Sequence, residues 1–311
     1  MVPSMQMIQS YEFPTDAVAA VKWRRATVLF RGDCLELLRR LPDASVDLTI
    51  ASPPYCIGKS YEQSRSVADF IAAQKQVLPA IARITKDGGS ICWEIGYHVA
   101  DGAVYPLDYE VFSILKGIDG IVLRNRIVWT YGHGEHARRR FSGRHEIVMW
   151  FTKGTDYLFD LDAVREPQKY PGKRKSSGPH KGEYSGNPKG KNPGDVWSIP
   201  NVKAKHVEKL GHPCQFPIGL ADRLVRALCP KNGLVFDPYM GTASSGVAAI
   251  LNGRRFMGAE IDKNYMEIAT ERLAQAYDGT VPHRPVDRPI FVPGPGLAVA
   301  RRPEHFVEHT K

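Results

Sequence analysis

The sequence predicts an α/β protein whose central sheet is doubly wound and mostly parallel. Short apolar runs bounded by Gly, Asp or Pro are typical of strands covered on both faces, and they alternate with segments of helical pattern. Such alternation is typical of parallel strands joined by crossover helices. A hydrophobic content of 43% over 311 residues is sufficient for a sizeable core.

The apolar runs predict these strands: 27–33, 46–52, 90–96, 124–132, 146–154, 234–240 and 254–262. Helical patterns occupy these segments: 34–41, 67–85, 107–118, 217–229, 243–252 and 263–277. The strands at 124–132 and 146–154 have no helix between them, so we expect one of them to run antiparallel.

Three stretches differ from this alternating pattern. Residues 165–195 hold eight Lys or Arg against three Asp or Glu and are rich in Gly, Pro and Ser, which predicts a basic loop that forms no core element. We expect residues 1–24 to form an N-terminal extension and the Pro-rich residues 278–311 to form an extended tail. One domain is therefore predicted at 25–277, with a first half at 25–154 and a second half at 205–277.

Charge and cysteine content limit the class of protein. The net charge of +9 and the pI near 9.3 suit a polyanionic partner such as nucleic acid, or a membrane surface, and are also compatible with a merely basic soluble protein. No stretch approaches the roughly 20 apolar residues of a spanning helix, and no signal-peptide pattern opens the chain. The five cysteines are scattered without a CxxC pair, so we expect no disulfide framework and no metal site in a cytoplasmic protein.

The segment 234–262 has the pattern of a nucleotide-type βαβ unit. One strand ends at Asp237, the loop GTASSG (241–246) and a helix of small residues follow, and a second strand ends at Glu260. An acidic residue about 20 positions after such a loop can hold ribose hydroxyls. Ala243 stands where a dinucleotide fingerprint has its second Gly, which favours an adenosyl ligand without phosphates.

Two further motifs complete a family resemblance. Ser-Pro-Pro-Tyr (52–55) follows the strand at 46–52, and HPCQFP (212–217) precedes the βαβ unit. Together the three motifs resemble the amino-methyltransferases of DNA, in the order of the β class: catalytic motif first, recognition segment in the middle, cofactor motif last. The resemblance covers about 25–277 and also includes GD (32–33), IVW (127–129), HE (145–146) and DVWSIP (195–200).

The resemblance implies a seven-stranded Rossmann-like methyltransferase sheet, S-adenosyl-L-methionine as cofactor and double-stranded DNA as substrate. The exocyclic amino nitrogen of a base is a poor nucleophile because its lone pair is delocalised into the ring. Ser52 Oγ and the Pro53 carbonyl can accept its hydrogens, while Pro53 and Pro54 hold that carbonyl rigid and Tyr55 stacks on a flipped base. The alternative for Ser52-Pro53-Pro54-Tyr55 is a proline-terminated strand with a buried tyrosine.

The same resemblance implies a set of cofactor-binding residues. Asp237, with the backbone near Gly241, would hold the methionine part, Glu260 the ribose and Asp33 the adenine edge. The full set is Asp33, His212, Pro213, Gln215, Phe216, Asp237, Pro238, Gly241, Thr242, Glu260 and Asp262. Asp33 and Asp237 could instead be helix N-caps, and Glu260 an ordinary acid at a strand end.

One residue invites a different chemistry. Cys214, inside HPCQFP, superficially resembles the nucleophile of the C5-cytosine methyltransferases. Transfer to an amino nitrogen is a direct displacement that needs no covalent intermediate, so we expect Cys214 to pack and not to react.

Two basic segments are predicted to contact DNA. The first places Arg138, Arg139, Arg140 and Arg144 around Phe141, and the second is 165–195, where Tyr170 and Tyr184 are interleaved with Lys169, Lys173, Arg174, Lys175, Lys181, Lys189 and Lys191. These side chains would bind phosphates, although charge runs are often only solvated. The short recognition segment favours a homodimer.

The target base depends on position 52. Ser is typical of cytosine-N4 enzymes, whereas Asp or Asn is usual before PPY in adenine-N6 enzymes. The context of 57–62, 127–132 and 194–200 is more similar to the adenine group, and adenine-N6 is favoured over cytosine-N4. Similar sequences include solitary adenine methyltransferases of bacteria. Enzymes of restriction-modification systems belong to the same family. The residues do not indicate whether a cognate endonuclease accompanies this protein. A non-catalytic DNA-binding protein and a protein-glutamine or RNA methyltransferase are the remaining alternatives.

Overall fold

A computed structural model describes residues 4–21, 27–55, 66–132, 134, 136–290, 294 and 296–298. Its sheet has nine strands in the order β1-β2-β11-β10-β3-β4-β8-β7-β9. The seven predicted strands correspond to β2 (Thr27–Arg31), β3 (Val46–Ala51), β4 (Thr85–Ile95), β7 (Ile121–Thr130), β8 (His145–Lys153), β10 (Leu234–Asp237) and β11 (Arg255–Glu260). Two short strands, β1 (Ile8–Tyr11) and β9 (Val196–Ser198), add the edges.

Strand direction follows the prediction. β1, β2, β11, β10, β3 and β4 pair in parallel, and β7 pairs in parallel with β9. β8 runs antiparallel to both of its neighbours, β4 and β7. Because no helix lies between β7 and β8, the chain returns directly and β8 is the reversed strand.

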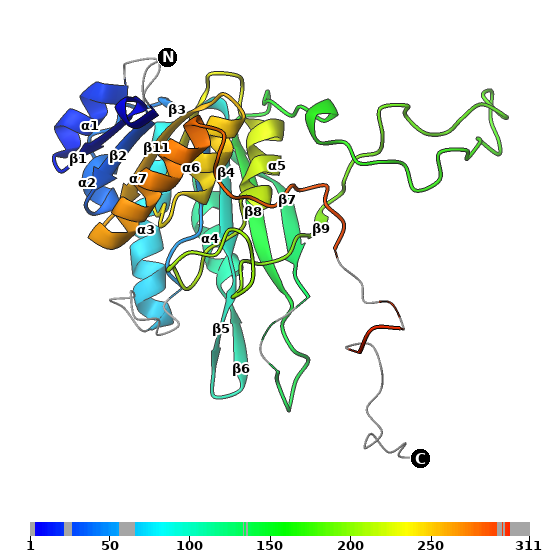
Figure 1. Ribbon diagram of the computed structural model, residues 1–311, viewed down its shortest axis with the longest axis horizontal. Coiled ribbons are helices and arrows are strands. Elements are labelled where there is room, and N and C mark those ends of the chain that lie inside the picture. Colours follow the sequence, from blue (N-terminus) through cyan, green and yellow to red (C-terminus); the bar gives the residue numbers. More distant parts are fainter. Residues whose placement is uncertain are drawn as a thin grey trace.

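Helices cover both faces of the sheet (Figure 1). One face carries α1 (Pro14–Val21), α2 (Cys34–Leu38), α3 (Val67–Ile84) and α4 (Leu107–Lys116), and the other carries α5 (Ile218–Leu228), α6 (Ser244–Leu251) and α7 (Lys263–Tyr277). Each face of the sheet has its own hydrophobic core, and successive residues of β10 point to opposite faces: Phe236 packs with the first group of helices and Val235 with the second. The doubly wound fold is thereby confirmed; η1 (Ser4–Met7) and η2 (Asp162–Val164) are short 3-10 turns.

The crossovers change face between β3 and β10, which are neighbours in the sheet. From β3 the chain reaches β4 through α3 on one face, and from β10 it reaches β11 through α6 on the other. In such sheets the crevice for ligands opens outside the carboxyl ends of the strands at this switch point. The residues after β3 and β10, where the sequence places two of its motifs, therefore meet there.

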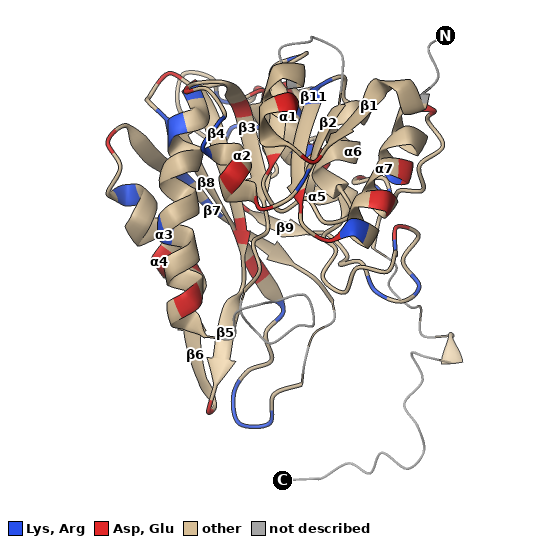
Figure 2. Cartoon of the chain, turned by 90° about the vertical axis from the view of Figure 1, so that its left-hand side faces the viewer, with Lys and Arg blue, Asp and Glu red and all other residues tan. Residues whose placement is uncertain are grey.

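Two projections extend beyond the carboxyl ends of the parallel strands. They are the hairpin of β5 (Tyr97–Ala100) and β6 (Ala103–Pro106), and the loop between β7 and β8, which lies beside it (Figure 2). A Cβ on Gly143 would stand 1.6 Å from Tyr97 Oη, so only glycine lets the loop lie against β5. The hairpin and the loop therefore form one rim.

Residues 165–195 form an arm that projects from the β9 edge (Figure 1). Its two limbs are joined by backbone hydrogen bonds, including Lys175 N to the Glu183 carbonyl at 2.9 Å and Ser185 N to the Lys173 carbonyl at 2.8 Å. The arm leaves the core, as its composition predicts.

Both predicted terminal segments contact the body. β1 extends the sheet beyond the boundary expected at residue 25, by pairing with β2. After α7, Val281 is buried and the backbone N–H of Arg284 donates to Glu208 at 3.0 Å. Within the described residues, no helix has the length and apolarity needed to cross a bilayer.

Candidate active site

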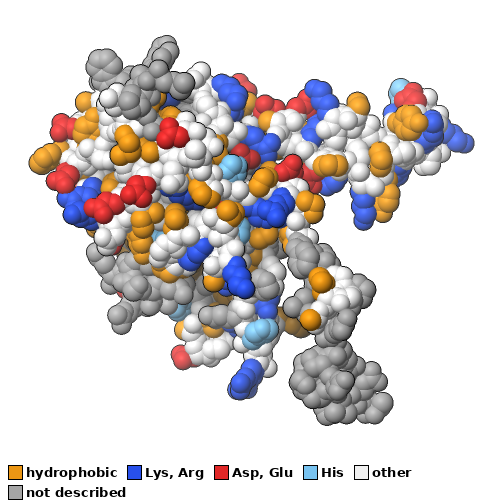
Figure 3. Space-filling view, viewed as in Figure 1, with side chains coloured by type: hydrophobic (Ala, Val, Ile, Leu, Met, Phe, Trp, Pro, Cys, Tyr) orange, Lys and Arg blue, Asp and Glu red, His pale blue; other side chains and the backbone are white. Residues whose placement is uncertain are grey.

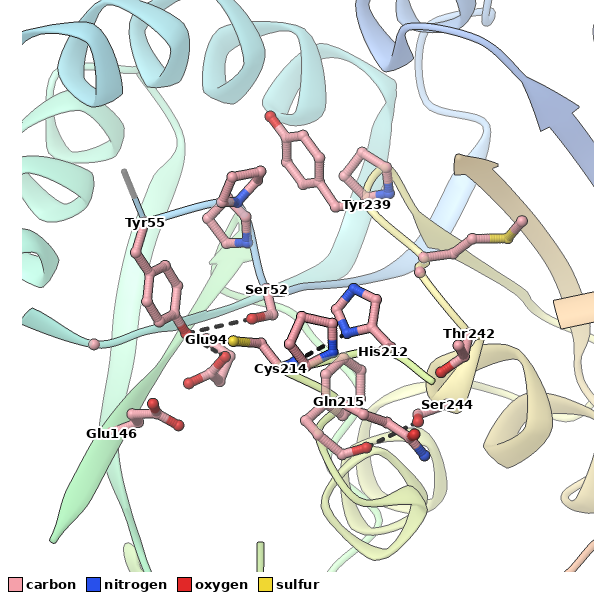
Figure 4. A pocket seen from close by; sticks show the side chains of 18 of the residues that line it. Ser52, Tyr55, Glu94, Glu146, His212, Cys214, Gln215, Tyr239, Thr242 and Ser244 are labelled. Atoms are coloured by element: carbon pink, nitrogen blue, oxygen red, sulfur yellow. Dashed lines mark hydrogen bonds between the residues drawn. The ribbon is translucent and has the colours of Figure 1, made fainter. Parts of the chain in front are cut away.

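A cavity of about 1110 Å³ opens at the carboxyl ends of the parallel strands. Ser52 reaches it from the end of β3, Pro238 from the end of β10, and Glu260 from the end of β11. All of the predicted catalytic residues, Ser52 to Tyr55, line it. Figure 4 shows Tyr55, Glu94 and Glu146 on one side of Ser52, and His212, Thr242 and Ser244 on the other.

A hydrogen-bonded chain fixes the catalytic corner. Tyr55 Oη donates to Glu94 Oε2 at 2.5 Å, and Ser52 Oγ lies 3.3 Å from Tyr55 Oη. A phenol has one hydrogen, and Glu94 receives it, so Ser52 is the donor to Tyr55. The lone pairs of Ser52 Oγ thus remain available to accept hydrogens from a ligand. Burial and the charge of Glu94 hold the pKa of Tyr55 well above its usual value, so the phenol stays protonated.

Glu94 and Glu146 form an acidic pair in the cavity wall that the sequence analysis left without a role. Burial raises the pKa of Glu94. Burial, followed by the charge of Glu94, raises the pKa of Glu146 well above its usual range, and Lys203 partly offsets this. Glu94 is a charged residue near the end of the otherwise apolar run 90–96. This break in the apolar pattern is the signal that could have indicated a site residue. Glu146 is the second residue of the antiparallel strand β8, whose start lies at the edge where the parallel strands end.

On the cofactor side, Glu260 organises the loop after β10. Its Oε2 accepts from Gly241 N at 2.9 Å and its Oε1 from Asp262 N at 2.8 Å. The backbone N–H of Ile261 is a third partner, and because a carboxylate offers about four lone-pair directions, one remains for a ribose hydroxyl. Gly241 has φ +50°, a conformation that favours glycine and turns its N–H toward Glu260. Burial raises the pKa of Glu260.

Asp237 lies beneath this loop instead of lining the cavity. It is fully buried and accepts from Tyr239 N at 3.0 Å and from Ser245 Oγ at 2.5 Å. Burial raises its pKa to about 7. The structure therefore gives Asp237 the task of shaping the loop, in place of the direct cofactor contact that the resemblance implies.

Asp33 and Asp262 are helix N-caps that also line the cavity. Asp33 Oδ1 accepts from Leu35 N at 2.8 Å at the start of α2. Asp262 Oδ1 accepts from Asn264 N and Tyr265 N at the start of α7. The capping alternative is correct for Asp33, and since capping uses only Oδ1, it is compatible with a ligand contact through Oδ2.

The segment 212–216 forms the cavity wall opposite α3, and His212, Pro213, Gln215 and Phe216 all line the cavity. His212 packs edge-on against Tyr265, with ring centroids 4.5 Å apart. Burial and nearby Lys209 lower the pKa of His212 to about 4, so the ring is neutral at pH 7. Its Nδ1 accepts from Cys214 N at 3.2 Å, which places the ring proton on Nε2. The Gln215 amide is tied to the Glu208 carbonyl at 2.7 Å.

A buried ion pair connects this wall to the cofactor loop. Arg272 on α7 lies 3.7 Å from Glu208, and it donates to the Thr242 carbonyl and to Ser244 Oγ, each at 2.9 Å. Glu208 in turn accepts from Ile218 N, at the start of α5, at 2.8 Å. Burial lowers the pKa of Arg272 to about 10. Neither residue stands in a recognisable motif, so sequence analysis missed both.

The expectation that Cys214 packs is wrong. Its side chain is exposed and lines the cavity, whereas Cys34, Cys92 and Cys229 are buried. Pro213 and Cys214 are exposed along the cavity wall, whereas Gln215 is buried and Phe216 packs against the core. Among the described residues no group of His, Cys, Asp and Glu is arranged to hold a metal ion.

Comparison with known proteins decides the family. Residues 46–271 match the family model described as DNA methylase. The chain belongs to the DNA methylase family. It is 42% identical to the type II methyltransferase M.BglII of Bacillus subtilis, over 79% of this chain and 68% of that relative. It is 30% identical to the DNA adenine methyltransferase YhdJ of Escherichia coli K12, over 80% of this chain and 83% of the relative.

A solved DNA modification methylase of Thermus thermophilus has a similar fold, with a TM-score of 0.57 and 25% identity over 82% of this chain and 97% of that one. The protein is thus a DNA methyltransferase of the N6/N4 amino-methylating kind, and its cofactor is S-adenosylmethionine.

The methylase has basic side chains in two places relative to its cavity. Arg140, on the β7–β8 loop, lines the cavity, and Arg138 and Arg139 beside it are exposed. The arm carries its cations away from the cavity, along the projection seen in Figure 3. Lys175 pairs with Glu183, Lys189 with Asp162 and Lys191 with Glu166. Within the described residues, Lys169, Lys173, Arg174 and Lys181 have no ion-pair partner.

Proposed function

We propose that the methylase transfers the methyl group of S-adenosylmethionine to the exocyclic amino group of a base flipped out of duplex DNA. The observation that carries this proposal is that the Ser52–Tyr55 corner after β3 and the loop after β10, which Glu260 holds, open into one cavity from adjacent strands. A cofactor bound along the Glu260 side would direct its sulfonium methyl toward a base held at Ser52.

On the base side, Ser52 Oγ and the Pro53 carbonyl accept the two amino hydrogens, which turns the nitrogen lone pair out of the ring plane and toward the methyl group. The hydrogen bond from Ser52 to Tyr55 and on to Glu94 orients Ser52 as an acceptor. When bound, S-adenosylmethionine would supply the methyl group: the nitrogen would bond to the methyl carbon as the carbon–sulfur bond breaks, S-adenosylhomocysteine would leave, and one amino proton would pass to solvent.

On the cofactor side, Glu260 would accept a ribose hydroxyl with its remaining acceptor position. His212, neutral and protonated on Nε2, can donate to the methionine carboxylate without adding a charge beside the sulfonium. Asp33 is placed to meet the adenine amino group. Asp237 contributes indirectly, through the loop that it shapes.

Adenine-N6 is the proposed acceptor. The sequence context around 57–62 and 127–132 and the 30% identity to an adenine methyltransferase support it. Cytosine-N4 is the second candidate, because Ser52 is the residue typical of that group. Digestion of enzyme-treated DNA to nucleosides, followed by mass spectrometry, separates the two: N6-methyladenine alone supports the first, and N4-methylcytosine alone supports the second.

Two substitutions test the site. We expect Ser52→Ala and Tyr55→Ala to keep cofactor affinity, measured by calorimetry, while methyl transfer to duplex DNA falls by about 100-fold or more. Glu260→Gln is the complementary variant, because it should weaken cofactor binding. Turnover unchanged in both Ser52→Ala and Tyr55→Ala would refute the assignment of the catalytic corner.

The assembly and location are part of the proposal. We propose a homodimer, in which one subunit helps to hold the DNA that the other modifies, and a cytoplasmic location. The recognition segment is short, and the arm extends beyond its own cavity, which supports the dimer. Light scattering behind a sizing column, with and without duplex DNA, tests it; a monomer in both states would contradict it.

A further inference from the structure

Phe141, at the tip of the β7–β8 loop, is the most exposed large hydrophobic side chain of the described residues. Its side chain is fully accessible, at 100%. Two other exposed aromatics have ring partners: Phe159 stacks on Trp150, and Tyr184 lies under Arg174. Phe141 has no such ring contact in the described structure, so its position serves no packing purpose inside the protein.

The loop holds this phenyl ring at the rim of the cavity. Residues on both sides of it, Arg140 and Gly143, line the cavity. Ala137 N donates to Ser142 Oγ at 3.1 Å and closes the tip, while Arg140 Nη1 donates to the Phe141 carbonyl at 3.2 Å.

The base of the loop is equally constrained. Gly143 lies against Tyr97, and a Cβ on Gly134 would stand 2.6 Å from the Gly143 carbonyl oxygen. Tyr131 N donates to the Arg144 carbonyl at 3.1 Å. The two limbs are therefore held together at the base of the loop.

We propose that Phe141 enters the DNA base stack and fills the space left by the flipped base. This inference rests on the proposed function, because it needs a base that leaves the duplex. Flipping leaves a gap between two base pairs, and a planar apolar ring placed there restores stacking on both. Arg138 and Arg139, exposed beside Phe141, are placed to bind the phosphates around that gap.

The ring acts as a positioning residue, since it touches DNA and not the reacting atoms. It should matter when the target base must be pulled from a matched pair, and little when the pair is already broken. Phe13, exposed at 68% in front of α1, is a matched control on a different part of the molecule.

The experiment compares the full-length enzyme with its Phe141→Ala, Phe141→Trp and Phe13→Ala variants. Substrates are duplexes that contain the methylation site found by modification-sensitive sequencing, with the target base either paired or opposite a mismatch. We expect Phe141→Ala to lower kcat/KM on the paired duplex by about 10- to 100-fold, the effect of losing one aromatic–base stack. On the mismatched duplex the loss should shrink to less than about threefold, because the mismatched base is easier to unstack.

A second measurement follows flipping itself. With 2-aminopurine at the target position, fluorescence should increase when the DNA binds to wild type, Phe141→Trp or Phe13→Ala. The increase should be much smaller with Phe141→Ala. Cofactor affinity should be equal in all four proteins.

Three outcomes would overturn the inference. They are no loss in Phe141→Ala, an equal loss on paired and mismatched duplexes, and a shift of Phe141→Ala from dimer to monomer in light scattering, which would make Phe141 a subunit contact. If wild type methylates neither duplex, the proposed function fails instead, so the two failures are distinguishable.

Discussion

The arm offers a quantitative test of how this methylase holds DNA. Of its seven predicted DNA-binding cations, three are paired with acids of the protein itself, and Lys169, Lys173, Arg174 and Lys181 are not paired within the described residues. The four without an acidic partner carry charge that can replace the counterions of phosphates, and Arg174 in addition stacks on Tyr184 and donates to the Gly182 carbonyl. The other three form ion pairs that stabilise the arm. We therefore change the unpaired four together to Gln, which keeps polarity and most of the side-chain length.

The magnitude follows from counterion release. Each phosphate neutralised on duplex DNA changes the slope of log K against log salt by about 0.9, so four contacts account for about 3.6. Between 50 and 200 mM salt, wild type should therefore lose roughly 150-fold more affinity than the quadruple variant, because 4 raised to the power 3.6 is about 150.

Fluorescence anisotropy of a labelled duplex, titrated at several salt concentrations with the cofactor product present, measures the two slopes. The matched control changes Lys175, Lys189 and Lys191 to Gln. This control should keep the wild-type slope even if its melting temperature falls. Equal slopes in wild type and the quadruple variant, or a reduced slope only in the control, would refute the division of the arm into paired and unpaired cations.

Three further outcomes are expected. Glu94→Gln should keep cofactor affinity and lower kcat by roughly tenfold or more, the effect of weakening one charge-assisted hydrogen bond to Tyr55; steady-state kinetics that show only a changed KM would contradict it. Arg272→Met should destabilise the protein by about 3–5 kcal/mol, since it leaves Glu208 buried without its partner, and urea unfolding measures this. Burial raises the folded-state pKa of Asp237 to about 7 from its ordinary value of 3.8, so the native state binds a proton that the unfolded state releases between those values. Stability due to this group is therefore lost as the pH rises toward 7, and Asp237→Asn should become more stable relative to wild type over that window; a constant difference in unfolding free energy would count against the buried carboxyl.

The sheet was predictable because its strands are short apolar runs covered on both faces. The reversal of β8 followed from the missing helix before it. The edges were not predictable: β1 and β9 have four and three residues, and Ile8 and Trp197 are their buried side chains, so neither carries a hydrophobic pattern. Their strand pairing depends on neighbours far away in the sequence.

The cavity was predictable where a motif joins residue type to a strand end, as at Ser52 and Glu260. Glu146 belongs to the HE pair of the resemblance, but its role escaped because it is the second residue of an antiparallel strand, so its place at the catalytic edge depends on strand direction and not on spacing. Arg272 escaped because its role is a long-range buried contact with Glu208, and helical periodicity alone does not distinguish it from a solvated arginine. Asp237 shows the converse: the motif implies a cofactor contact, whereas its burial beneath the loop gives it the task of shaping that loop.

The shared carboxylate of Glu208 sets a limit on how far this enzyme can be trimmed. It receives the backbone N–H of Arg284 as well as Arg272 and the start of α5, and a Cβ added to Gly219 on that helix would stand 3.6 Å from Val286. A protein shortened directly after α7 would uncover α5 and remove one hydrogen bond from a buried charge next to the methyl-donor wall. Purification tags and fusion partners therefore belong beyond residue 290, and proteolytic cleavage near 280 should loosen cofactor binding although the cut lies outside the catalytic motifs.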